Sequence, residues 1–113
     1  MKITTENLAA GIILKPVGRI DQNSAMQFQD ALLDAISSQK TGGVAIDMSG
    51  VEFLSSIGLR ALMIGFKHSK SLGGKLALYD FTSIVREVFA ISRFDTMLNC
   101  FDAREPALAS LET

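Results

Sequence analysis

The sequence predicts a single α/β domain with a mixed, mostly parallel β-sheet, an N-terminal hairpin at one edge and about four flanking α-helices. Short runs of β-branched and apolar residues alternate with longer segments in which apolar residues recur every three or four positions. Glycine pairs and polar clusters separate these segments. Strands that alternate with helices imply right-handed parallel crossovers. We expect residues 1–113 to form one domain.

The chain begins with a predicted β-hairpin. Residues 11–20 are rich in β-branched residues and end before a polar cluster, which is typical of a strand. Pro16 indicates that this strand lies at an edge or carries a bulge. Residues 2–6 are expected to pair with it through a turn at residues 7–11.

A helix is predicted after the hairpin. Ser24 is a suitable N-cap, and Gln27 three residues later would complete a capping box. Polar residues and two glycines at 37–43 indicate the end of this helix. Its inner face is expected to consist of Phe28, Leu32, Leu33 and Ile36.

The rest of the chain continues the alternation of strands and helices. The expected elements are a buried strand at 44–48, a loop at 49–54, a helix at 56–69, a strand at 75–79, a helix at 83–92, a short strand at 97–100 and a helix near Pro106. Four methionines at apolar positions are expected in the core, namely Met26, Met48, Met63 and Met97.

Composition and charge exclude several classes of protein. The formal net charge is −1, so no basic excess favours nucleic-acid binding. Cys100 is the only cysteine, and no intrachain disulfide can form. The N-terminus has no signal-peptide core, and no apolar run reaches the ~20 residues of a membrane span. We expect a cytoplasmic protein without membrane insertion, which is a monomer or a weak dimer because no long apolar surface stripe remains.

The sequence lacks the motifs of an enzyme. Its single histidine, His68, lies among polar residues of a predicted helix and is expected on the surface. One histidine and one cysteine, far apart, do not form a zinc site. No phosphate-binding glycine loop and no GxSxG elbow are present. We therefore expect no catalytic residues, no metal and no cofactor.

One segment, residues 44–62, carries the functional information. It runs from the buried strand through Ser49-Gly50-Val51 to two serines and a glycine at the start of a helix. This segment resembles the STAS domain family, the fold of bacterial anti-sigma-factor antagonists. In that family a strand that ends in an Asp-x-Ser-x-Val type sequence leads to an Asp-Ser-Ser/Thr-Gly-Leu type motif, whose first serine is phosphorylated. The resemblance extends over nearly the whole chain.

The resemblance implies roles for individual residues. Asp47 takes the acidic position at the strand end, and Asp21 matches the acidic residue that closes the second strand. Ser55 stands where the motif has aspartate, and Ser56 takes the position of the phosphorylated serine, with Ser55 the less favoured acceptor. The implied partner-binding residues are Asp21, Asp47, Ser55, Ser56, Gly58, Leu59 and Arg60.

The same residues have simpler interpretations. Ser55 or Ser56 can serve as a plain N-cap, because a serine hydroxyl accepts hydrogen bonds from the free N–H groups of a helix start. Asp21 and Asp47 can be turn residues. If both of their strands end at one edge of a parallel sheet, the two aspartates are expected near Ser56. A phosphate on Ser56 would be tolerated by the fold, since helix N-termini stabilise anions.

Two functions are compatible with this resemblance. In the first, the unphosphorylated chain binds an anti-sigma factor with a histidine-kinase-like ATPase fold. This partner phosphorylates Ser56, and a serine phosphatase resets the chain. In the second, the chain is an adaptor subunit of a lipid-trafficking ABC transporter or a sensory complex, without phosphorylation. Neither function assigns a catalytic residue to the chain itself.

Overall fold

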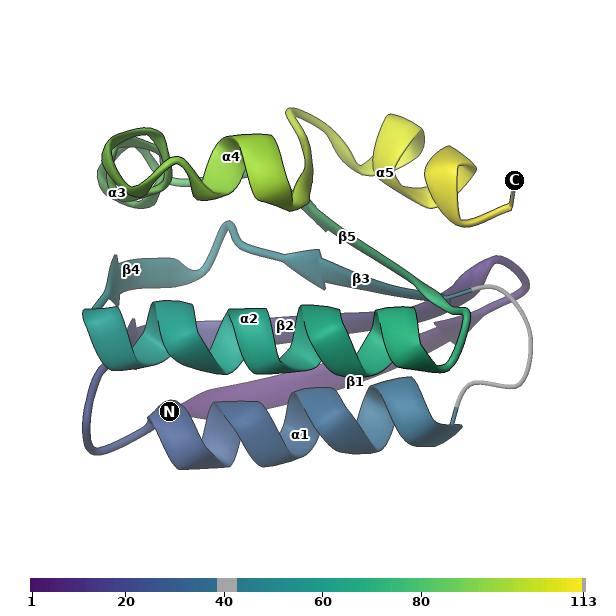
Figure 1. Cartoon of the computed structure of the whole chain (residues 1–113), viewed down its shortest axis with the longest axis horizontal. Coiled ribbons are helices and arrows are strands. Elements are labelled where there is room, and N and C mark those ends of the chain that lie inside the picture. Colours follow the sequence, from purple (N-terminus) through teal and green to yellow (C-terminus); the bar gives the residue numbers. More distant parts are fainter. Residues whose placement is uncertain (39–42, 113) are drawn as a thin grey trace.

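The central feature of the computed structural model is a mixed sheet, and the structure describes residues 1–38 and 43–112 (Figure 1). The sheet has the strand order β1-β2-β3-β5-β6, with β4 paired to β2. The elements in chain order are β1 (Lys2–Leu8), β2 (Gly11–Ile20), α1 (Ala25–Ser38), β3 (Gly43–Asp47), β4 (Val51–Leu54), α2 (Ser56–Ser71), β5 (Lys75–Tyr79), α3 (Ser83–Ser92), α4 (Phe94–Met97), β6 (Asn99–Phe101) and α5 (Arg104–Leu111).

The strand directions confirm the predicted fold class. Strands β1 and β2 form an antiparallel hairpin at one edge. All other pairs, β2 with β3, β2 with β4, β3 with β5 and β5 with β6, are parallel. The predicted end of the first helix falls partly on residues 39–42, which lie outside the described residues.

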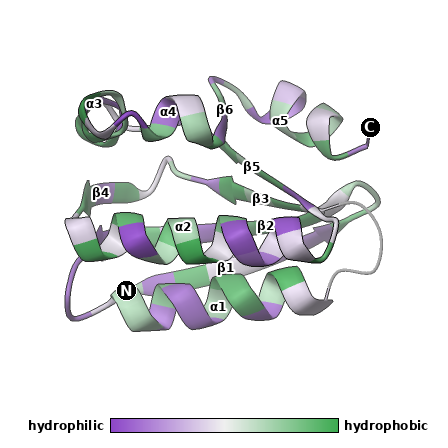
Figure 2. Ribbon diagram, in the orientation of Figure 1, coloured by the Kyte–Doolittle hydropathy of each residue, from purple (hydrophilic) through white to green (hydrophobic). Residues whose placement is uncertain are grey.

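Helices α1 and α2 cover one face of the sheet side by side (Figure 1). Hydrophobic and hydrophilic residues alternate along both helices (Figure 2), and most of the hydrophobic ones, though not Met26 and Ile57, face the core. At the crossing of the two helices, a Cβ added at Gly65 would lie 2.3 Å from Leu32 Cδ2. Leu32 is fully buried, so a methyl group at position 65 would force its side chain to shift within the packed core.

The opposite face of the sheet is packed against α5. This face presents small residues from β3 and β5, Ala45 and Ala77, against which Ala107 and Leu111 are buried. Because α5 has eight residues, it covers only part of that face. Helix α3 instead packs beside β4, where Val85 and Phe89 join the core that α1 and α2 cover.

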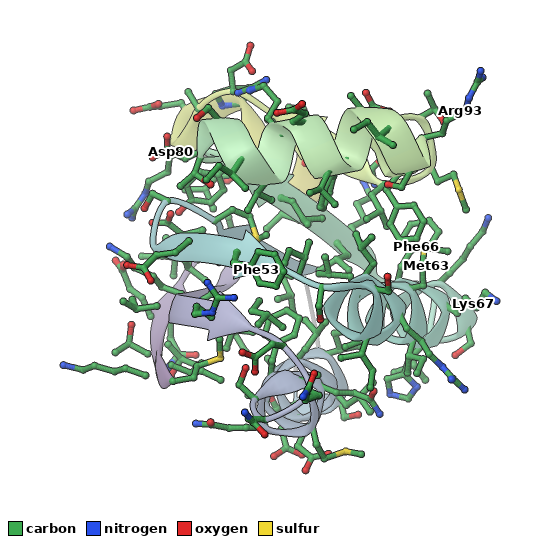
Figure 3. The ribbon with its side chains drawn as sticks, turned by 90° about the vertical axis from the view of Figure 1, so that its left-hand side faces the viewer. Phe53, Met63, Phe66, Lys67, Asp80 and Arg93 are labelled. Atoms are coloured by element: carbon green, nitrogen blue, oxygen red, sulfur yellow. The ribbon has the colours of Figure 1, made fainter. Side chains whose placement is uncertain are left out.

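Aromatic and aliphatic side chains connect α2 to the part of the molecule that contains α3. Met63 and Phe66 project from α2 toward α3, whereas Lys67 points outward (Figure 3). Phe89 of α3 lies 5.0 Å from Phe81 and 6.3 Å from Phe94, measured between ring centroids. These aromatic contacts hold α3 against the end of the sheet.

Two elements were not predicted from the sequence. The segment 51–54, expected as a loop, is the parallel strand β4. Its register against β2 shifts between Gly18 and Arg19, and this bulge removes the simple alternation by which a strand is recognised. Helix α4 follows a left-handed residue, Arg93 (φ 63°), and brings the described helices to five rather than about four.

The predicted capping box at the first helix is wrong. The Ser24 hydroxyl donates to the Arg19 carbonyl (2.6 Å) and accepts from the Asp21 N–H (3.1 Å). The Gln27 side chain donates to the Met1 carbonyl (3.2 Å). Ser24 thus closes the turn between β2 and α1. The N–H groups of Ser24 and Ala25 donate to the Asp21 carbonyl oxygen, so the backbone of Asp21 accepts the first hydrogen bonds at this helix start.

Half of the methionine prediction is also wrong. Met48 is fully buried and Met63 packs on the core, as expected. Met26 is 65% exposed and Met97 is 49% exposed. Near the C-terminus, the last strand begins at Asn99 and the last helix at Arg104, so that Pro106 lies in its first turn.

The close approach at Gly65 gives a stability prediction. Gly65→Ala should lower the free energy of unfolding by about 1–3 kcal/mol, because the new methyl group overlaps Leu32. Alanine is the better helix former by about 1 kcal/mol, so helix propensity alone predicts the opposite sign. Urea denaturation measures the difference, with the exposed Lys67→Ala on the same helix as control. A Gly65→Ala protein more stable than the parent would contradict this account of the helix crossing.

Candidate functional site

The two serines at the start of α2 occupy different positions. Ser55 is the N-cap, with extended backbone (φ −83°, ψ 173°), and its Oγ accepts a hydrogen bond from the Gly58 N–H (3.2 Å). Ser56 is the first helical residue, and its side chain is exposed. Among the described residues its hydroxyl has no hydrogen-bond partner. The cap interpretation therefore applies to Ser55, while the Ser56 hydroxyl remains accessible.

Strands β2 and β4 hold this helix start in place. Leu54 pairs with Ile20, and the Ser55 N–H donates to the Ile20 carbonyl (3.0 Å). A Cβ on Gly58 would lie 2.6 Å from Leu54 Cδ1 and 2.8 Å from Ile20 Cγ2. Glycine at position 58 therefore lets the first turn of α2 pack directly on the ends of β2 and β4. In Figure 3 this end of the molecule faces the viewer, with Phe53 on β4.

Asp21 lies beside the serines, as expected, because it directly follows Ile20. Its Oδ1 accepts from the Asn23 N–H (3.0 Å), so it is also a turn residue. Its Oδ2 lies 3.7 Å from Arg19 Nε, and the Arg19 guanidinium lies 4.3 Å from the centre of the Phe53 ring. A carboxylate and an ordered arginine thus lie close to the helix start.

Asp47 does not lie near the serines. The preceding residue, Ile46, pairs with Leu14, whereas Leu54 pairs with Ile20. Leu14 and Ile20 are six positions apart in β2, which corresponds to about 20 Å along the strand. The unpredicted strand β4 is the physical reason, because it carries the chain beyond the end of β3 before α2 begins. Asp47 Oδ1 instead accepts hydrogen bonds from the Ser49 N–H (2.9 Å) and hydroxyl (2.7 Å).

A shallow groove between α1 and α2 adjoins Ser56. Its volume is about 340 Å³, and its exposed apolar residues are Met26 and Ile57 (47% exposed). Arg60 lies at the same groove, while Leu59 is half-buried against the core. The full lining is Gln22, Ala25, Met26, Gln29, Ile57, Arg60 and Ile64.

Sequence reasoning missed Met26 and Ile57 as surface residues of this site. Ile57 follows Ser56 directly, so the sequence already placed it next to the expected phosphorylation site. Met26 lies thirty residues away in α1, and only the packing of α1 on α2 brings it to the groove. We expected no long apolar surface stripe, and Met26 and Ile57 together place exposed apolar surface at the groove between the two helices.

The electrostatics of the helix start suit an added anion. Helix α2 has no acidic residue in its first turn, so the partial positive charge of its N-terminus is not neutralised there. Arg60, one turn into the helix, adds a cation. Asp21 opposes these charges from the neighbouring turn. A phosphate on Ser56 would therefore be tolerated by the helix and would change the charge of this surface.

Elsewhere in the described chain, the surroundings of the histidine, cysteine and acidic side chains define the chemistry that they can support. Among residues 1–38 and 43–112, no three His, Cys, Asp or Glu side chains converge in a way that could hold a metal ion. Burial raises the pKa of the Cys100 thiol to about 11, which disfavours the nucleophilic thiolate at neutral pH. His68 Nε2 lies 3.0 Å from Ser37 Oγ and links α2 to α1. Residues 1–38 and 43–112 include no helix with the length and apolar character of a membrane span.

Comparison with known proteins identifies the family to which this fold belongs. The STAS domain model matches residues 2–107. BtrV of Bordetella bronchiseptica, described as a candidate anti-sigma factor antagonist, is 28% identical over 113 residues, which are 100% of this chain and 97% of BtrV. A Thermotoga maritima protein with a similar description superimposes with a TM-score of 0.88 at 20% identity, over 98% of this chain and 95% of that one.

SpoIIAA, described as an anti-sigma factor antagonist, has a similar fold. Its unphosphorylated form gives a TM-score of 0.77 at 18% identity, over 93% of this chain and 90% of SpoIIAA. Its phosphorylated form, from Bacillus, gives 0.71 at 16% identity, over 96% and 97% of the two chains. Together with the match over residues 2–107, the sheet order and the glycine-anchored start of α2 show that this chain belongs to the STAS domain family.

Proposed function

We propose that the chain is an anti-sigma factor antagonist, a regulator without enzymatic activity of its own. Its partner is an anti-sigma factor with a histidine-kinase-like ATPase fold, which binds the α2 end and phosphorylates Ser56. A serine phosphatase restores the unphosphorylated form. The observation that carries the proposal is that the two adjacent serines differ: Ser55 caps α2, whereas the Ser56 hydroxyl is exposed.

The proposed interface combines charged and apolar groups at one end of the molecule. It comprises Asp21, Ser55, Ser56, Gly58, Leu59 and Arg60, to which the groove adds Met26 and Ile57. The exposed apolar side chains would supply buried area, and Asp21 and Arg60 would fix the orientation of the partner. Asp47 is left out of this interface because about 20 Å of strand separates it from the helix start.

Phosphorylation would act on the partner's surface rather than on the fold. A phosphate adds roughly −1.5 to −2 charges. Because Ser55 remains the cap, the helix start keeps its hydrogen bond to Gly58 in either state. In the complex with the partner, the same phosphate would lose its contact with water. The free energy of this desolvation would weaken binding to the partner.

The phosphorylation site gives the first functional prediction. With the cognate kinase and ATP, one phosphate should be added, on Ser56. Ser56→Ala should abolish labelling, whereas Ser55→Ala should still be labelled although it loses a cap worth about 0.5–2 kcal/mol of stability. Mass spectrometry of the labelled tryptic peptide distinguishes the two serines. Labelling of Ser55 would overturn the assignment.

Partner affinity gives the second prediction. Ser56→Asp should weaken binding by about 30-fold, the lower end of the roughly 2–5 kcal/mol cost of an unpaired interfacial charge, because aspartate carries less charge than phosphate. Ser56→Ala should bind as the parent does. Ser83→Asp is a matched control, since Ser83 is the first residue of α3 after the Thr82 cap. Calorimetry with the purified partner measures all three.

Undiminished binding by Ser56→Asp would remove the switch and leave the adaptor function, as a subunit of an ABC transporter or a sensory complex. The unfolding midpoints of the Ser56 variants show whether weaker binding reflects a loss of folded structure. An acidic residue at the first helical position interacts favourably with the helix dipole, so the Ser56→Asp fold should be at least as stable as the parent.

A further inference from the structure

A polar cavity lies on the face of the sheet that α5 covers only in part. Alternation along the strands places Lys15, Asp47 and Tyr79 on this face, together with Thr4 opposite Lys15 on β1. The cavity has a volume of about 290 Å³, at the small end of the range for ligand sites. It is lined by Thr4, Thr5, Glu6, Ile13, Lys15, Asp47 and Arg104.

A buried hydroxyl lies beside this cavity. Tyr79 is 2% exposed, and its hydroxyl has no hydrogen-bond partner among the residues that the structure describes. Tyr79 pairs with Asp47 in the register of β3 and β5. Burial raises the pKa of Tyr79 to about 12, an effect that Asp47 and Glu6 strengthen and Arg104 opposes. The hydroxyl is thus neutral and closed to solvent behind the cavity wall, within the field of three charged residues that line the cavity.

The charges around the cavity balance in sign. Arg104 Nη2 lies 3.4 Å from Glu6 Oε2, which leaves a long and partly exposed ion pair at the rim. Asp47 Oδ1 is held by Ser49, as described above. The Lys15 side chain is exposed and has no ion pair within the described part of the chain. Two acids and two bases therefore line one small space.

This balance decides which ligands are matched. A polyphosphate would meet the carboxylates of Glu6 and Asp47, and a simple cation would meet Lys15 and Arg104. A molecule that carries both charges at once satisfies the two sets together. We propose that this cavity binds a small zwitterion of amino-acid type, with its carboxylate toward Lys15 and Arg104 and its ammonium group toward Asp47.

The site is independent of the proposed partner interface. Asp47 is separated from the end of β4 by about 20 Å of strand, so occupancy of the cavity leaves Ser56 accessible. Failure of the phosphorylation experiments would not affect this proposal, and failure here would not affect the switch.

The test is a titration of the full chain, followed by backbone amide NMR, with three probes of similar size. L-alanine carries both charges, L-lactate only the negative one and ethylamine only the positive one. Saturable shifts at Lys15, Asp47 and Arg104 with L-alanine alone would support the proposal. Equal shifts with L-lactate or ethylamine, or no saturation with L-alanine up to about 100 mM, far above a millimolar Kd, would overturn it.

Two variants assign the contacts. Arg104→Gln should weaken L-alanine binding by about tenfold or more, the value of a hydrogen bond between charged groups. Its unfolding midpoint should change little, because Arg104 is exposed and its ion pair with Glu6 is long. Lys15→Gln should weaken binding, whereas Lys67→Gln on α2 should not. Unchanged affinity in both Arg104→Gln and Lys15→Gln would overturn the assignment of the site.

Discussion

The short parallel pairing between β2 and β4 is the constraint on which the functional end of this protein depends. Leu54 pairs with Ile20, and the Ser55 N–H binds the Ile20 carbonyl, so the start of α2 is tied to the end of the hairpin strand. Because β4 continues the sheet beyond the end of β3, it moves the serines away from Asp47 and next to Asp21. Four residues of strand thereby decide which acid accompanies the helix start.

Close packing at two glycines of α2 makes this geometry possible. Gly58 lets the first turn of the helix lie on Leu54 and Ile20, and Gly65 lets the middle of the helix approach Leu32 of α1. A side chain at either position would lift the helix away from its support. The groove that contains Met26 and Ile57 exists because α1 and α2 are held this close along their length.

The structure separates the stability of the helix start from its regulation. The cap bond is made by Ser55, which is half-buried, and the neighbouring hydroxyl of Ser56 is exposed and takes no part in it. A charge added at Ser56 meets the favourable end of a helix that has no acid in its first turn. A modification there can change what binds to the surface while the underlying fold remains intact.

The sequence by itself determined the hairpin, the parallel crossovers, the main helices and the position of the two serines, because periodicity and glycine breaks are local properties. It also placed Asp21 correctly, since that residue directly follows a strand end. It failed for β4, whose bulge disturbs the alternation, and for the Ser24 cap, which competes with Asp21 for the same turn. Only the tertiary structure decided that Asp47 lies apart, that Met26 reaches the groove and that Tyr79 lies beside a charged cavity, because each depends on which strands and helices become neighbours.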